Sequence, residues 1–169
     1  MEIVRSVFRA MLYMAALGLL SHIIGQALPR HWFHGDRGWF RQAAWEENGR
    51  FYERLKIRRW KTRLPDKSRV VKSMVPKRLD GDTNSAKLDL LVKETCVAEV
   101  IHLALALVSP TIYRFCRNAV GVVFSVLFGI GNLPFVAIQR YNRPKLLALQ
   151  ERMRKREESQ DHARADSVG

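Results

Sequence analysis

The chain has only two cysteines and five histidines among 169 residues, and this scarcity excludes several kinds of metal site. Cys96 and Cys116 lack the spacing of metal ligands, and we expect both to be reduced thiols. A di-iron site would use Glu94, Glu99 and His102, but five histidines are too few for the histidine-rich membrane enzymes of that type. We therefore expect no metal and no cofactor.

Acidic residues are also few, since 16 Asp and Glu stand against 29 Lys and Arg and leave a net charge of +13. A basic chain invites a nucleic-acid interpretation. Here, however, most of the hydrophobic residues gather in three blocks, at 10–28, 97–112 and 119–138. These blocks favour a membrane surface rich in anionic lipid, or anionic substrates, and no nucleic-acid partner.

Strand patterns are missing too, because residues 69–75 form the only short β-like stretch. Residues 119–138 contain no charge and reach about 30 Å as a helix at ~1.5 Å per residue, enough to span a bilayer. Residues 10–28 are a second candidate, as an anchor or as a cleavable signal segment. The predicted class is therefore all-α, a small integral membrane protein with two or three membrane helices and interfacial amphipathic helices.

Four regions follow from this distribution. Residues 1–28 form the anchor or signal segment, and residues 29–93 a basic, aromatic-rich interfacial region with an amphipathic helix from Ala44 past Leu55. Residues 94–143 form a membrane helical hairpin, and residues 144–169 a basic helix whose last ten residues are disordered. The basic segment 50–78 and the basic tail predict that both lie on the cytoplasmic side of a bacterial cell membrane, whereas a cleaved signal segment would place the basic segment outside.

The hairpin begins with three ionisable residues where an apolar run starts: Glu94, Glu99 and His102. Charged groups near lipid cost free energy and are usually kept for function. On a helix His102 lies about 60° from Glu99 and about 80° from Glu94, at ~100° per residue. The pattern predicts a histidine base supported by a carboxylate.

The other end of the hairpin carries a second polar group: Arg140, Tyr141, Asn142 and Arg143. An antiparallel pair of helices brings its two open ends to the same depth of the membrane. We therefore expect these four residues to bind substrate beside the base.

Four motifs carry a resemblance to a known family: W-E-E-N-G-R-F-Y-E-R (45–54), I-R-R-W-K-T-R-L-P-D (57–66), E-T-C-V-A-E-V-I-H (94–102) and Q-R-Y-N-R-P-K-L (139–146). In this combination the chain resembles the glycosyl-4,4'-diaponeurosporenoate acyltransferases over residues 29–157. The resemblance implies a bacterial membrane enzyme that acylates the sugar of a glycosylated carotenoid. The chain differs from the family in the acidic residues that follow Glu157 at its carboxyl end.

Acyl transfer assigns a role to each predicted residue. His102 removes the proton of a sugar hydroxyl, Glu99 or Glu94 orients it, and the arginines bind the phosphates of an acyl-CoA or acyl-carrier donor or stabilise the oxyanion. The acceptor is a glycosyl carotenoid or a similar glycolipid, held in membrane lipid. Cys96 is disfavoured as a nucleophile, because it lies about 120° from His102 around a helix. An H-x4-D pattern from His31 to Asp36 is disfavoured as an acyltransferase signature, because two fixed positions arise easily by chance.

The same residues also fit a protein that catalyses no reaction. In a small, non-catalytic membrane interaction or assembly protein, His102 and Glu99 only form hydrogen bonds between helices.

Overall fold

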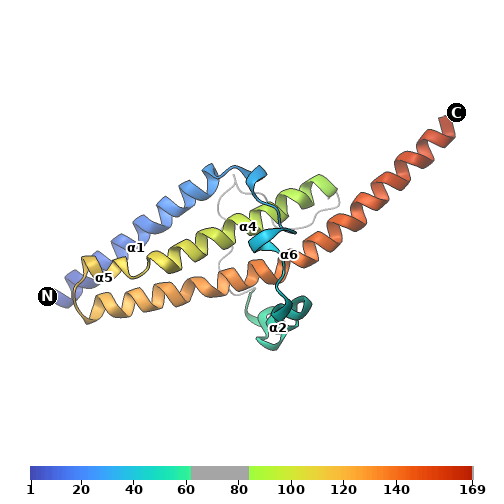
Figure 1. Cartoon of the computed structure of the whole chain (residues 1–169). Helices are drawn as coiled ribbons and strands as arrows, with labels where there is room; N and C mark the ends of the chain where they lie inside the picture. Colours follow the sequence, from blue (N-terminus) through green and yellow to red (C-terminus); the bar gives the residue numbers. More distant parts are fainter. Residues whose placement is uncertain (62–83, 169) are drawn as a thin grey trace. The chain divides into compact units, whose positions relative to one another are not determined.

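A computed structural model describes residues 1–61 and 84–168, and in those residues every regular element is helical. The long helices are α1 (Glu2–Ala27), α4 (Ser85–Val108) and α6 (Ala119–Val168) (Figure 1). The short helices are α2 (Arg50–Arg54), α3 (Ile57–Trp60) and α5 (Thr111–Phe115), with 3-10 turns η1 (Arg30–Trp32), η2 (Gly38–Phe40) and η3 (Ala44–Gly49). The all-α prediction is confirmed; the strand-like stretch 69–75 and the basic residues 62–78 lie outside the described residues.

The chain forms two compact units. Unit 1 combines Met1–Pro29 with Val97–Gln139, and unit 2 combines Arg30–Cys96 with Arg140–Gly169. Helices α4 and α6 therefore contribute residues to both units.

In unit 1, α1, the second half of α4, α5 and the first part of α6 lie side by side (Figure 1). Gly25 faces Ile101, whereas Tyr13 Oη lies 2.9 Å from Thr111 Oγ1, so α1 runs antiparallel to α4 and α5. The core of the unit contains Ala10, Ile112 and Cys116. Its apolar packing thus joins the first hydrophobic block to the end of the second.

The surface of unit 1 remains strongly apolar. Large hydrophobic side chains are exposed along α1 and the first part of α6: Ile3, Val4, Phe8, Met11, Leu12, Leu19, Leu20, Ile23, Ile24, Val122, Val123, Val126, Leu127, Ile130 and Leu133. By length and composition, Glu2–Ala27 and the helix from Ala119 are able to cross a membrane. An exposed apolar surface of this extent is uncommon among soluble proteins.

Helix α6 is longer than the sequence pattern predicts. We expected the apolar helix to end near Pro144 and the last ten residues to be disordered, yet the helix continues to Val168. A proline removes only one helical hydrogen-bond donor, and here the helix continues through it. Beyond it, Arg154 forms ion pairs with Glu151 and Glu158 at helical spacing, which supports the solvated end.

The amphipathic helix expected from Ala44 is instead divided into η3, α2 and α3. Gly49 has φ 92° and Lys56 has φ 53°, left-handed conformations that no continuous helix contains. In place of one apolar stripe, the aromatic rings of Trp45, Phe51 and Tyr52 pack on one another. This break allows the 3-10 turn to place a glutamate inside unit 2.

The close approach of α6 to the end of α5 depends on Gly121. A Cβ atom at Gly121 would lie 1.8 Å from the backbone oxygen of Cys116, whereas a Cβ at Gly131 would meet nothing within 4 Å. We expect Gly121→Ala to destabilise the protein by at least about 1–3 kcal/mol, since the backbone must shift. Thermal unfolding in detergent measures this.

Gly131→Ala is the matched control in the same helix. It should be neutral or more stable by about 0.5–1 kcal/mol, the usual gain for Gly to Ala in a helix. Equal Tm values for the two variants would contradict the close contact at Gly121.

Candidate functional site

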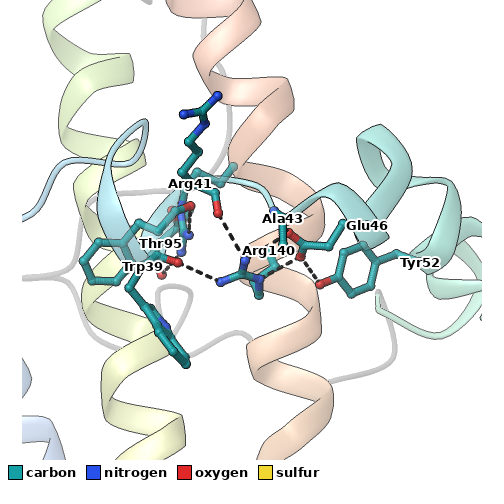
Figure 2. A network of polar contacts seen from close by, with 9 residues as sticks. Trp39, Arg41, Ala43, Glu46, Tyr52, Thr95 and Arg140 are labelled. Carbon is teal, nitrogen blue, oxygen red and sulfur yellow. Dashed lines mark hydrogen bonds and ion pairs between the residues drawn. The ribbon is translucent and has the colours of Figure 1, made fainter.

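Unit 2 contains a buried ion pair between Glu46 of η3 and Arg140 of α6 (Figure 2). The Arg140 guanidinium donates to both carboxylate oxygens, from Nε at 2.7 Å and from Nη2 at 2.9 Å. It also donates to the backbone oxygens of Trp39 and Arg41, at 3.2 and 3.3 Å. The Glu46 side chain is 1% exposed and that of Arg140 13%, so the carboxylate is removed from water and the guanidinium largely so.

Two further donors satisfy the Glu46 carboxylate. The Ala43 amide donates to Oε2 at 2.6 Å, and the Tyr52 hydroxyl donates to Oε1. Burial alone raises the pKa of a carboxyl group, but the hydrogen bonds from Arg140, Tyr52 and Ala43 outweigh it and hold the pKa of Glu46 below 4.5. The same burial, with the adjacent carboxylate, raises the pKa of Tyr52. Glu46 is therefore ionised and Tyr52 protonated at neutral pH.

Arg143, one turn along α6, joins the loop before η3 to α4. Its Nε donates to Thr95 Oγ1 at 2.9 Å and its Nη1 to the Phe40 backbone oxygen at 2.9 Å. Its guanidinium also lies 5.2 Å from the centre of the Phe40 ring. The residue is 2% exposed, and it lies against Gly35, where a Cβ would be 3.1 Å from Arg143 Cδ.

Tyr141 and Asn142 face a group of cations. Arg58 Nε donates to Tyr141 Oη at 2.9 Å, and Lys145 Nζ lies 3.4 Å from the centre of the Tyr141 ring. Lys61 Nζ donates to Asn142 Oδ1 at 3.1 Å. The four residues predicted to bind substrate thus belong to unit 2 and have partners inside it.

The three predicted catalytic residues divide between the units. Glu94 belongs to unit 2, where Arg30 Nε donates to its Oε1 at 2.7 Å. Glu99 and His102 belong to unit 1, and Glu99 is completely buried.

In unit 1, His102 is oriented by residues of α6. Its Nδ1 lies 2.8 Å from Asn132 Oδ1, and its ring stacks on Phe135 with the planes 9° apart. Asn132 Nδ2 donates to the Phe128 backbone oxygen, so the amide presents its oxygen to the histidine. An amide oxygen only accepts hydrogen bonds, so in this arrangement Nδ1 is the donor to Asn132.

A cavity of about 270 Å³ lies beside the Glu46–Arg140 pair within unit 2. Its walls include Arg140 and Arg143, together with the loop residues Asp36, Phe40 and Gln42. Within residues 1–61 and 84–168 no group of three His, Cys, Asp or Glu is arranged to hold a metal ion. Both cysteines are buried.

Sequence reasoning missed Glu46, Tyr52, Thr95 and Asn132 as parts of these networks. Asn132 had a signal, because it is the only amide in the charge-free run 119–138. Glu46 lies in the motif at 45–54, but it stands next to a second glutamate, and nothing in the sequence separates the buried one from the exposed one.

Comparison with known proteins identifies relatives along almost the whole chain. A family model described as glycosyl-4,4'-diaponeurosporenoate acyltransferase matches residues 36–152. Proteins of that name from Staphylococcus aureus strains RF122 / ET3-1, MRSA252 and N315 are each 24% identical to the chain over 159 residues. Each alignment covers 94% of this chain and 96% of the relative. No solved structure is significantly similar to it.

The buried carboxylate predicts an acid-sensitive fold. Because the pKa of Glu46 is lowered in the folded protein, its contribution to stability is present above pH 4.5 and is lost as the pH falls through the folded-state value. Glu46→Gln should cost about 3 kcal/mol at pH 7, since it leaves Arg140 buried without its counter-charge. The substitution should also make the free energy of unfolding depend less on pH in the acid range. Thermal unfolding in detergent between pH 7 and pH 3 measures both effects.

Glu47→Gln is the control, one residue away. Glu47 pairs with Arg54 at 2.7 Å, but both side chains are exposed, so the loss should stay below about 1 kcal/mol. An unchanged acid dependence in Glu46→Gln would show that another carboxyl group is responsible.

Proposed function

The chain belongs to the glycosyl-4,4'-diaponeurosporenoate acyltransferase family, and from this premise we propose that it transfers a fatty acyl group to a sugar hydroxyl of a glycosylated carotenoid or a similar glycolipid. The family match over residues 36–152 is the observation that carries the proposal. It includes Glu46, Glu99, His102 and the segment 140–143.

His102 is the proposed general base. With its proton on Nδ1, held by Asn132 Oδ1, the imidazole presents a lone pair at Nε2 to a hydroxyl group. The Asn132 carboxamide orients the histidine, as the carboxylate does in a serine-protease triad. Unlike that carboxylate, it adds no charge.

The carboxylates take different roles in this proposal. Glu94 forms an ion pair with Arg30, so we propose that it holds Arg30 in place and does not act on the substrate. Glu99 shares unit 1 with His102, one helical turn away, and its carboxylate stabilises the imidazolium formed during transfer. The assignment of Glu99 over Glu94 follows from these different surroundings.

The proposed reaction is one displacement at a thioester. Nε2 takes the hydroxyl proton while the sugar oxygen forms a bond to the acyl carbonyl carbon. The carbon–sulfur bond of the donor then breaks, and the imidazolium gives its proton to the departing thiolate. The products are a sugar ester and a free thiol.

The acyl donor is proposed to be acyl-CoA or an acyl carrier protein, both anionic. The cations around Tyr141 and Asn142, namely Arg58, Lys61 and Lys145, offer charge of the opposite sign. Arg140 and Arg143 form the wall of the nearby cavity, where their contacts with Glu46 and Thr95 hold them in place.

A membrane location suits the proposed acceptor. The exposed apolar side chains of α1 and α6 form a surface for lipid, in which the carotenoid chain also dissolves. We propose that the protein resides in a bacterial cell membrane.

The base is tested with purified protein, glycosyl-4,4'-diaponeurosporenoate and acyl-CoA, with the ester measured by mass spectrometry. His102→Gln should lower kcat by about 10²–10⁴-fold, the usual contribution of a general base. Asn132→Ala should lower kcat about 3- to 10-fold with both KM values unchanged, since it removes one orienting hydrogen bond. His162→Gln, in the exposed end of α6, should behave as the wild type.

Equal rates for His102→Gln and wild type would exclude histidine as the base. A wild-type protein that forms no ester with either donor class, while its deletion leaves pigment unaltered, would instead favour a non-catalytic membrane protein.

A further inference from the structure

Three cations of unit 2 gather around one buried tyrosine, and we call Arg58, Lys61 and Lys145 the cation group. Arg58 Nε donates a hydrogen bond to Tyr141 Oη at 2.9 Å, and Lys145 Nζ lies 3.4 Å from the centre of the Tyr141 ring. Lys61 Nζ lies 5.1 Å from the same ring centre and donates to Asn142 Oδ1 at 3.1 Å. Tyr141 is 1% exposed, so it holds the cations in place and is itself closed to a ligand.

The cation group has less counter-charge than positive charge. In the part of the chain that the structure describes, Glu53 is the only carboxylate that pairs with it. Glu53 Oε1 lies 3.6 Å from Arg58 Nη2 and 4.0 Å from Lys145 Nζ. Both distances exceed the ~2.7–3.2 Å of an N–H···O hydrogen bond. Three cations and one loosely held carboxylate leave an excess of two positive charges.

The titration of the buried members reflects this excess of positive charge. Burial is the largest cause that lowers the pKa of Lys61, and the charges of Lys145 and Arg58 lower it further, against the opposing effect of Tyr141. Burial raises the pKa of Tyr141, but the hydrogen bonds and charges of Lys145 and Arg58 outweigh it and lower the pKa. A surrounding that disfavours another positive charge and favours a negative one also favours a bound anion.

A bound anion is able to contact two of the cations at once. The Arg58 side chain is 72% exposed and that of Lys145 47%, so both are open to solvent. One atom, Glu53 Oε1, lies within 4.0 Å of both, so the two cations are close enough to share one anionic group.

The excess of two charges matches one kind of anion best. A phosphate monoester carries about −1.5 to −2 charges at pH 7 and three strong acceptor oxygens. A phosphate diester carries only one charge. Coenzyme A has a monoester at its 3′ position, whereas the phosphopantetheine of an acyl carrier protein is attached through a diester.

We propose that the cation group binds the 3′-phosphate of an acyl-CoA donor, with Arg58 and Lys145 donating hydrogen bonds to its oxygens and Lys61 adding positive charge. This inference rests on the proposed function and deepens it, because it selects acyl-CoA over an acyl carrier protein as the donor.

The first test compares acyl-CoA with acyl-dephospho-CoA, which lacks only the 3′-phosphate, using the full chain in detergent. Arg58→Gln and Lys145→Gln should each raise the KM for acyl-CoA about 3- to 10-fold, because each removes one charge-assisted contact at a partly exposed site. The KM for acyl-dephospho-CoA should not change. Glu53→Gln should act in the opposite direction and lower the KM for acyl-CoA, since it removes a negative charge beside the phosphate.

Arg54→Gln is the matched control. It removes the same charge from α2, where Arg54 pairs with Glu47 at 2.7 Å and lies outside the cation group. Both KM values should equal those of the wild type.

The second test separates a nucleotide phosphate from a lipid head group, which also carries phosphate. Titration calorimetry measures binding of adenosine 3′,5′-bisphosphate and of adenosine 5′-monophosphate to the protein in phosphatidylcholine nanodiscs. The bisphosphate should bind about 10-fold more tightly, and Arg58→Gln should remove most of the difference. Phosphatidic acid, a monoester lipid, should not compete when it is added to the nanodiscs.

The outcomes distinguish this proposal from the proposed function. If Arg58→Gln changes the KM of both thioesters equally while acyl transfer continues, the phosphate site alone is overturned. Competition by phosphatidic acid would assign the cation group to a lipid head group and overturn the assignment to the donor. A protein that prefers the bisphosphate through Arg58 but forms no ester would support the phosphate site and overturn acyl transfer.

Discussion

The ion pair between Glu46 and Arg140 is the contact on which the arrangement of unit 2 depends. A buried carboxylate and a buried guanidinium are each costly to remove from water, and they are tolerated only together with good geometry. Here both oxygens of Glu46 are engaged, by Arg140, Tyr52 and the Ala43 amide. Because Arg140 also binds the backbone of residues 39 and 41, one side chain holds the whole loop against α6.

Unit 1 meets a different constraint. Its exposed surface is strongly apolar, and its helices meet through close contacts and a few internal hydrogen bonds. Gly121 allows the backbone of α6 to approach Cys116, and Gly129 lies against Ser109. The hydroxyl groups of Ser109 and Ser125 donate hydrogen bonds to backbone oxygens three and four residues earlier in the chain. The hydrogen bond between His102 and Asn132 instead joins α4 to α6.

Some of the candidate site was predictable from residue type alone. A histidine and two glutamates at the start of an apolar run are conspicuous, and so is the polar segment 140–143 that follows another run. Their partners were not predictable. Asn132 lies thirty residues from His102, and Glu46 lies ninety-four from Arg140, separations over which periodicity carries no information.

The helix boundaries were also only partly predictable from the sequence. The pattern of hydrophobic residues located the apolar parts of α1 and α6 correctly, because an uninterrupted run of about twenty apolar residues is typical of a helix. It missed the breaks at Gly49 and Lys56, since these serve the burial of Glu46, and it missed the continuation of α6 to Val168.

The sequence by itself determined the helical class, the apolar spans, the excess of positive charge and the family, because each depends on local composition or on motifs in order. Only the tertiary structure decided that an amide orients His102, that Arg30 engages Glu94, and that Glu46 is buried against Arg140 and Tyr52. The reason is physical: the cost of a buried polar group is set by what surrounds it, and those surroundings come from segments distant in the chain.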